Sequence, residues 1–313
     1  MNRLSKGAAT LAAAYSAAMS GHEGTWADGS PLALEIAGTD AKLIHGVQEG
    51  ARLAHLGLLS ALDHLDGLAV LLANPNVVFS PATVCRGAIE AGAVCYYLLD
   101  PHVGPREHAR RYTNERLETL NETRLFAERT GQKQPAEERK TKTAELIREA
   151  RELGLAVHEP RQAWQAPYVG SKPPSTTTLI QEVLSTGDLG KNLYWFLSAT
   201  VHARAHGLAQ YLTVLEHTHE RDVVRTTLAV TPDQAAIRYS GANLTVAAAG
   251  ARLFKRFGWD DSSLALPTQL TLAAWAEVAG LPARTFNDSV SAFHAAQTIP
   301  ASFVKAPKTT TDV

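Results

Sequence analysis

The sequence has almost no charge imbalance, contains few cysteines, and lacks a glycine-rich phosphate loop. Its 313 residues carry 30 Lys and Arg against 31 Asp and Glu, a formal net charge of -1. Broad binding to nucleic acid or to an acidic membrane surface requires a basic field, so this balance argues against nucleic acid as a partner. With 45% apolar residues, 22 Gly and 15 Pro, the composition excludes a disordered or collagen-like chain. We expect a folded protein of one large domain or two modest ones.

The two cysteines cannot be joined to each other. Cys85 and Cys95 both fall in a predicted helix over residues 80–99, where ten residues at about 1.5 Å each separate them by roughly 15 Å. Bridged Cα atoms lie within about 7 Å, so a disulfide is excluded and a cytoplasmic location is expected. The alanine-rich start after Arg3 and Lys6 is expected to be a helix rather than a signal peptide. No run reaches the roughly 20 apolar residues of a membrane span, so no membrane is expected as a partner.

Apolar residues at spacings of three and four predict helices along most of the chain. Ser80 is expected as the N-cap of the helix over 80–99, with Pro81 in its first turn. Small residues on this helix, including Gly87, Ala91 and Gly92, favour a crowded central position in a bundle. Two charged outer helices are expected to follow it. The predicted helical segments cover residues 42–73, 80–99, 105–130, 178–184, 189–217, 242–257, 267–278 and 284–296, and residues 131–154 are expected to form a polar turn and then a helix.

Two segments do not follow the helical pattern. Residues 157–175 are rich in Pro, Gly and aromatic side chains and are expected to form a long loop. Residues 225–241 contain Thr231-Pro232-Asp233 between two short extended candidates, which predicts a β-hairpin. The expected fold is therefore an all-α, multi-helix bundle with one small β-hairpin and one long Pro-rich loop. Its expected parts are a main bundle with a polar pocket over 1–220, and a hairpin with C-terminal helices packed on it over 221–313.

A polar stripe on the helix predicted over 189–217 is the strongest indication of a site. Tyr194, Ser198, His202 and His206 recur every four residues, so on a continuous helix they would share one side. Apolar residues surround them in the sequence, which indicates a stripe that is at least partly buried. Buried polar groups need hydrogen-bond partners, so neighbouring helices should supply polar side chains.

Several such partners can be named. Arg86 and Glu90 are one turn apart on the small-residue helix, in a segment otherwise almost free of charge, and Tyr97 lies two turns further on. His55 interrupts the apolar face of the first long helix. Arg110 belongs to a dense polar cluster at the start of the next helix.

These residues suggest a pocket for a small polar or anionic ligand. In this interpretation His202 acts as an acid or base with Glu90 as its partner, and Arg86 or Arg110 holds an anionic group. The ligand would also contact Ser198 and the remaining polar side chains of the cluster, Tyr97, Tyr194 and His55.

Two other interpretations of these residues remain open. The polar residues could fix the register of the helices in a non-catalytic interaction module. They could belong to a metal- or haem-dependent enzyme, in which His202 and His206, spaced by four, would be ligands. The pair lacks the adjacent Glu of the HExxH zinc motif, and the sequence does not identify a cofactor. Whether the chain is an enzyme is also left open.

The order of these motifs resembles that of known proteins. A long helix, Arg86-x3-Glu90 on a small-residue helix, a charged helix and Tyr194-x3-Ser198-x3-His202 are similar to a group of actinobacterial helical-bundle proteins and, diffusely, to HEPN-type domains, over residues 43–215. The resemblance implies a four- or five-helix bundle that could form a homodimer, and a nucleotide- or RNA-acting defence component. Active HEPN ribonucleases carry Arg-x4–6-His, whereas this chain has Arg204-Ala205-His206, which puts ribonuclease activity in doubt.

Overall fold

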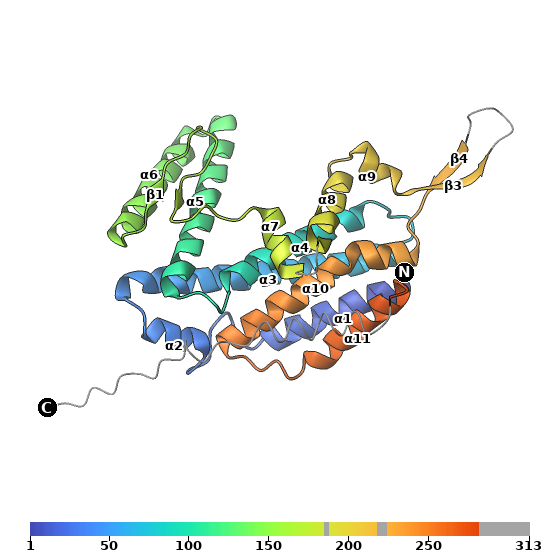
Figure 1. The fold of residues 1–313 in the computed structure, drawn as a ribbon, viewed down its shortest axis with the longest axis horizontal. Coiled ribbons are helices and arrows are strands. Elements are labelled where there is room, and N and C mark those ends of the chain that lie inside the picture. Colours follow the sequence, from blue (N-terminus) through green and yellow to red (C-terminus); the bar gives the residue numbers. More distant parts are fainter. Residues whose placement is uncertain (185–187, 218–223, 282–313) are drawn as a thin grey trace.

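A computed structural model describes residues 1–184, 188–217 and 224–281, and the chain is predominantly helical there (Figure 1). The expected all-α bundle with one small hairpin is confirmed. The predicted helix over 284–296 lies outside the described residues. The elements are α1 Asn2–Met19, α2 Pro31–Ala37, α3 Ala41–Ala73, α4 Ser80–Leu98, α5 Pro105–Arg129, α6 Lys133–Glu152, β1 Val157–His158, β2 Tyr168–Val169, α7 Thr176–Leu184, α8 Leu189–Val201, α9 Ala205–Ala209, β3 Leu212–His217, β4 Val224–Leu228, α10 Pro232–Phe257 and α11 Ala265–Val278.

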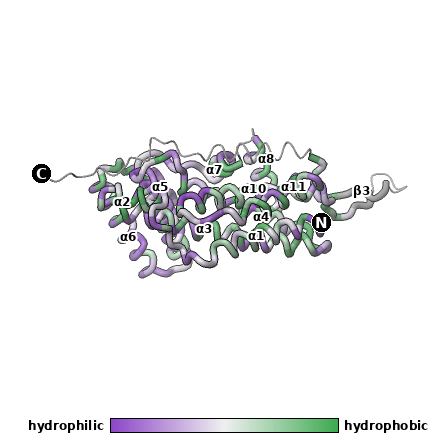
Figure 2. The backbone as a smooth tube through the Cα atoms, turned by 90° about the horizontal axis from the view of Figure 1, so that it is seen from below, coloured by the Kyte–Doolittle hydropathy of each residue, from purple (hydrophilic) through white to green (hydrophobic). Residues whose placement is uncertain are grey.

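Charge is distributed unevenly along the molecule. Hydrophilic residues gather at the end that holds α2, α5 and α6, whereas the bundle helices α1, α4, α10 and α11 are mainly apolar (Figure 2). The expectation that α5 and α6 are charged outer helices is confirmed, since α6 buries only Ala136 and Ala150. The net charge of -1 is that of the whole chain, and it does not show the difference between the apolar bundle and the strongly polar helices α5 and α6.

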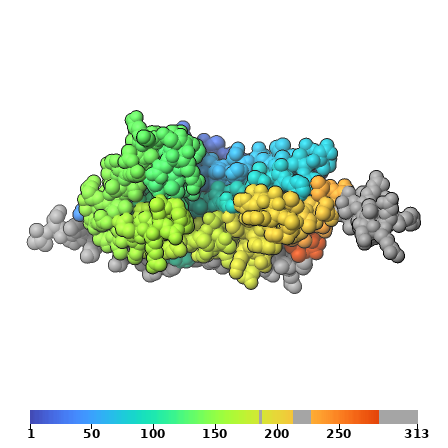
Figure 3. All heavy atoms as spheres, turned by 90° about the horizontal axis from the view of Figure 1, so that it is seen from above, coloured from blue at the N-terminus to red at the C-terminus, as the bar shows by residue number. Residues whose placement is uncertain are grey.

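The α5–α6 unit projects from the bundle and has a small core of its own (Figures 1 and 3). Leu117, Ala150, Leu155 and Val169 form that core. The Pro-rich segment after α6 folds over it and pairs β1 with β2 in antiparallel fashion. Asn114 of α5 fixes β2, because its side-chain amide donates to the Val169 carbonyl at 3.1 Å and accepts from the Val169 amide at 2.8 Å. A loop that was expected from proline content is thus tied down by side chains of α5.

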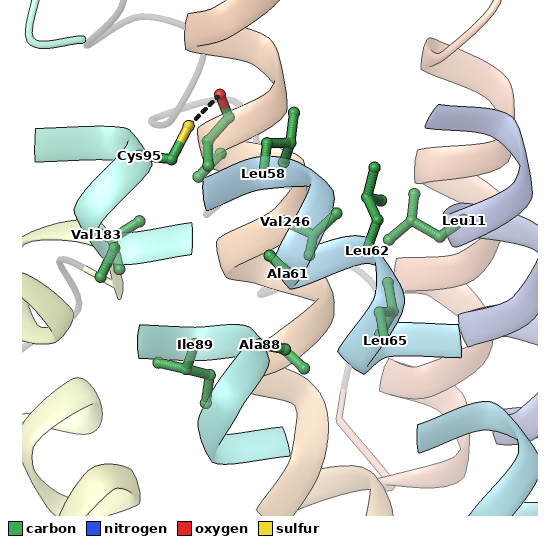
Figure 4. Packing of buried hydrophobic residues seen from close by; sticks show 14 of the residues in the cluster. Leu11, Leu58, Ala61, Leu62, Leu65, Ala88, Ile89, Cys95, Val183 and Val246 are labelled. Carbon is green, nitrogen blue, oxygen red and sulfur yellow. Dashed lines mark hydrogen bonds between the residues drawn. The ribbon is translucent and has the colours of Figure 1, made fainter. Parts of the chain in front are cut away.

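The main core is one hydrophobic cluster around α3, α4 and α10. Buried Leu58 and Leu65 of α3, Ile89 of α4 and Val246 of α10 belong to it (Figure 4). The helices approach closely because glycine stands at contact points: a Cβ at Gly92 would lie 2.6 Å from Cγ2 of Thr245. The central position expected for the small-residue helix is therefore confirmed. The cluster also includes α1 and α11, so it continues through the C-terminal helices, and the division at residue 220 stays a prediction.

One predicted cap and one predicted turn were wrong. Ser80 is the first residue of α4, and Phe79 occupies the N-cap position without a side-chain cap. Thr231-Pro232-Asp233 begins α10, where the Thr231 hydroxyl and Gln234 form a capping box and Pro232 stands in the first turn. Thr, Pro and Asp favour both β-turns and the first turn of a helix, so these residue types did not distinguish the predicted hairpin turn from the start of α10.

The hairpin exists, but at a different place from the predicted one. β3 pairs with β4 in antiparallel register, with Leu212 opposite Leu228. The helix predicted over 189–217 is accordingly divided into α8, α9 and β3. The periodic apolar residues of α8 do not continue past Val201, and the apolar residues after it were wrongly assigned to the same helix.

By length and composition, α3 could cross a membrane, which the sequence analysis did not anticipate. Among the described residues no other helix meets that criterion. Core helices of proteins without membrane spans meet it too, and α3 packs against α1, α4 and α5 with Leu58, Leu62 and Leu65 buried.

The core contains a buried hydroxyl without a partner. Thr245 of α10 is 0% exposed, and its Oγ1 has no hydrogen-bond partner among the described residues. Because an unsatisfied buried polar group costs about 1–3 kcal/mol, we expect Thr245→Val to raise the free energy of unfolding by about 1 kcal/mol or more. Urea unfolding followed by circular dichroism measures the change.

Thr271→Val is the matched control. Thr271 of α11 is equally buried, but its hydroxyl donates to the Gly7 carbonyl of α1 at 3.0 Å. This variant loses a buried hydrogen bond, so it should lower the free energy of unfolding by about 1 kcal/mol. Equal changes in the two variants would contradict the assignment of Thr245 as an unsatisfied group.

Candidate functional site

The helices α7, α8 and α9 form a small unit on the surface of the bundle (Figure 1). Close contacts at two glycines hold it together. A Cβ at Gly190 would lie 2.8 Å from the Ile180 carbonyl oxygen of α7, and one at Gly207 would lie 2.6 Å from the Ala199 carbonyl carbon of α8. Any larger residue at either position would force these helices apart.

α8 ends in a tight turn that determines where the site residues point. His202 is its C-cap, and Ala203 adopts a left-handed conformation with φ 51°. The Ala203 amide donates to the Thr200 carbonyl, and the Arg204 amide donates to the Ala199 carbonyl, as in a Schellman motif. Glycine usually occupies this position, so alanine is strained there.

The end of α8 changes the predicted stripe. Tyr194, Ser198 and His202 lie along α8 and its cap as expected, but His206 belongs to α9. The turn brings the His206 ring back onto the Trp195 indole, with ring centroids 4.7 Å apart and planes at 17°. His206 is thus near the site by tertiary folding and not by helical spacing.

Four of the predicted site residues form one hydrogen-bonded cluster between α4 and α8. The Arg86 guanidinium donates from Nε to Glu90 at 2.8 Å and from Nη2 to the Tyr194 hydroxyl at 3.1 Å. Its Nη1 lies 3.2 Å from Nε2 of His202. The Tyr194 hydroxyl in turn donates to Glu90 at 2.8 Å. Arg86 is therefore the centre of the cluster, and it links two helices that are distant in sequence.

The protonation states in this cluster follow from its contacts. Burial alone would lower the pKa of Arg86, but the hydrogen bond and charge of Glu90 outweigh it and raise that pKa above its ordinary value. Burial, reinforced by the bond to Glu90, raises the pKa of Tyr194, so the phenol stays protonated at neutral pH. Arginine has no acceptor, so Nε2 of His202 accepts from it and the ring proton is on Nδ1.

Next to this cluster is a cleft of about 630 Å³. Among the described residues, its lining contains two cationic side chains, Lys191 and Arg204, and no carboxylate. Neither cation forms an ion pair within the part of the chain that the structure describes. In Figure 3 the gold α8–α9 segment lies on the surface, apart from the green α5–α6 unit. The cleft is lined by Thr177, Lys191, Asn192, Tyr194, Trp195, Ser198, Ala199, His202, Arg204 and His206.

Glu90 and Arg86 stand behind the cleft and do not line it. Glu90 accepts hydrogen bonds from Arg86 and Tyr194 and forms none with His202, and of these two donors Tyr194 lines the cleft. The geometry therefore gives Glu90 a positioning role toward Arg86 and Tyr194. Arg86 uses three of its N–H groups on protein acceptors, so its charge is already compensated before any ligand arrives.

Three predicted site residues lie elsewhere. The Tyr97 ring packs under the Arg111 guanidinium at 4.1 Å. Arg110 binds Glu107 and donates to the carbonyls of Val169 and Ser171, so it anchors the loop after α6. Both lie outside the cleft and the cluster, because Tyr97 is near the end of α4, where it contacts Arg111 of α5, and Arg110 is on α5 itself.

His55 is also separate from the cleft. Its ring packs edge to face on Trp259 with centroids 5.7 Å apart. Burial lowers the pKa of His55, which favours the neutral ring in this aromatic environment.

The described residues include no group of three His, Cys, Asp or Glu arranged to hold a metal ion. His202 and His206 both line the cleft, but Nε2 of His202 faces Arg86 and the His206 ring stacks on Trp195. A metal bound through Nε2 of His202 would have to displace Arg86.

Most of the cleft lining was not among the predicted site residues, in particular Lys191, Trp195 and Arg204. A pattern was present for two of them: Lys191, Trp195 and Ala199 are spaced by four and run beside Tyr194, Ser198 and His202 on α8. Arg204 could not be found this way, since it reaches the cleft through the turn at Ala203.

Comparison with family models, curated proteins and solved structures finds no match for this chain. The assignment of the site therefore depends on its own geometry.

The contact at Gly207 provides a test of how the cleft is held. Gly207→Ala should separate α9 from α8 and lower the free energy of unfolding by about 1–3 kcal/mol, because the new methyl group meets backbone atoms. It should also disrupt the stacking of His206 on Trp195. Urea unfolding and the near-ultraviolet circular dichroism of tryptophan measure the two effects.

Gly21→Ala is the control for this variant. Nothing lies within 4 Å of a Cβ at Gly21, so its stability should stay within about 0.5 kcal/mol of the wild type. A stable Gly207→Ala variant with an unchanged tryptophan spectrum would contradict the tight α8–α9 contact.

His202 is expected to contribute little to stability. It is exposed, and its loss leaves Arg86 bound to Glu90 and Tyr194. His202→Ala should therefore leave the melting temperature nearly unchanged or slightly raised, whereas Arg86→Ala should lower it by several degrees because Glu90 and Tyr194 lose their common partner. Differential scanning calorimetry compares the two. A loss of several degrees in His202→Ala would instead favour a register-fixing role for His202.

Proposed function

We propose that the cleft formed by α7, α8 and α9 binds a small anionic ligand. The observation that carries this proposal is that the described residues of the lining include Lys191 and Arg204 and no carboxylate. Two cations on one concave surface that pair with no carboxylate of the described residues create a local positive potential, even though the whole chain has a net charge of -1. A volume of about 630 Å³ is within the usual range for small-molecule sites.

The remaining polar lining suits an anion as well. The hydroxyls of Ser198 and Thr177 and the amide of Asn192 can donate hydrogen bonds to oxyanions. His202 adds Nδ1–H as a donor, since its Nε2 accepts from Arg86. The guanidinium of Arg86 holds the ring in this state, so the cluster behind the cleft supports binding by fixing His202 and Tyr194.

Catalysis by His202 is less well supported than binding. General acid or base chemistry at Nε2 would require Arg86 to move first, because the two nitrogens lie 3.2 Å apart. Glu90, the expected catalytic partner, contacts Arg86 and Tyr194 instead. Binding with His202 as a donor requires no rearrangement, and it is the role that we assign to the residue.

Isothermal titration of the full chain with inorganic phosphate tests the proposal. Phosphate should bind weakly to the wild type, and Lys191→Ala combined with Arg204→Ala should weaken binding at least about tenfold, because two charge-assisted contacts are lost. Raising the salt concentration should weaken binding in the wild type more than in the double variant.

Arg161→Ala is the control for this titration. Arg161 is an exposed cation in the loop between β1 and β2 and does not line the cleft. Its loss removes one unit of positive charge without touching the site, so phosphate affinity should be unchanged. The proposal is wrong if phosphate does not bind at millimolar concentration, or if the Lys191/Arg204 variant binds it as well as the wild type.

A further inference from the structure

The cleft has a second feature that simple anion binding does not use. Trp195 of α8 lines it and is 58% exposed, although tryptophan is usually well buried. The His206 ring covers one face of the indole at 4.7 Å. The exposed area therefore includes the other face and the ring edge, which remain open to a ligand.

The indole is held ready for such a contact. Trp195 lies within the helical part of α8, and His206 is fixed behind it by the packing of Gly207 against Ala199. A rigid aromatic platform loses little conformational entropy when a second ring stacks on it. Ala199, one turn further along α8, is small and also lines the cleft, so it leaves space beside the indole.

The cations lie at a definite distance from this platform. Lys191 is one helical turn before Trp195, a separation of roughly 6 Å along the axis of α8. Arg204 and His202 line the cleft beyond the other end of α8. A molecule whose ring rests on Trp195 can therefore place an anionic group near a cation in either direction.

We propose that the ligand of this cleft combines a planar aromatic ring with an anionic group such as a phosphate, with the ring stacked on Trp195 and the anion held by Lys191 or Arg204. The proposal rests on the proposed function, since it adds a ring site to the anion site. Ligands of this chemical class include aryl phosphates and mononucleotides. A small anion without a ring would leave the indole uncovered and bind more weakly.

Titration calorimetry of the full chain with phenyl phosphate and methyl phosphate tests the ring site. The two probes have the same anionic group and differ in the ring. Phenyl phosphate should bind about tenfold more tightly to the wild type, the gain expected from one aromatic stacking contact. Trp195→Leu should reduce this preference to less than about twofold and leave the affinity for methyl phosphate unchanged.

Trp164→Leu is the matched control, because Trp164 is 61% exposed but lies in the loop between β1 and β2 and does not line the cleft. It should keep the full preference for phenyl phosphate. His206→Ala should lower the preference part of the way, since the indole loses the ring behind it.

The outcomes separate the two proposals. If both probes bind the wild type equally well, the ring site is wrong and the anion site stands. If Trp195→Leu weakens both probes to the same extent, the indole only shapes the cleft, and the ring site is again overturned. If neither probe binds at millimolar concentration, the anion site itself fails and the ring site fails with it.

Discussion

The close packing of α4 between α3 and α10 is the constraint on which the rest of the structure depends. Glycine and alanine at the contacts allow the helix axes to approach, and Gly92 leaves no room for even one methyl group beside Thr245. A helix packed this tightly has few positions for polar side chains. Arg86 and Glu90 therefore occupy the part of α4 that faces α8, and their partners must come from that helix.

This constraint explains why the cluster and the cleft lie next to each other but differ in character. The charge of Arg86 is matched by Glu90 within the same helix, so the cluster is close to neutral and serves to fix α8. Lys191 of α8 and Arg204 at the start of α9 line the cleft, and neither forms an ion pair with another described residue. The neutral network is thus separate from the cleft that we propose as an anion site, and Tyr194 and His202 belong to both.

Much of the fold could be predicted because helices depend on local periodicity. The long apolar repeat of α3 and the small residues of α4 gave the right elements. The cluster of Arg86, Glu90, Tyr194 and His202 was predicted as well, because buried polar groups on apolar helices must pair. Predictions were wrong where the same residue types are common in two kinds of local structure. Thr231 and Pro232 are favourable in a β-turn and at the start of a helix, and only the helix that follows them decides between the two.

The sequence by itself determined the helical class, the central position of α4 and the need for polar partners across α4 and α8, since these follow from side-chain size, spacing and polarity along one chain. Only the tertiary structure decided that α8 stops at Val201 and that His206 returns onto Trp195. It also separated Tyr97, Arg110 and His55 from the cleft. These features depend on a strained turn at Ala203 and on the contact at Gly207, which arise between segments and leave no periodic pattern in the sequence.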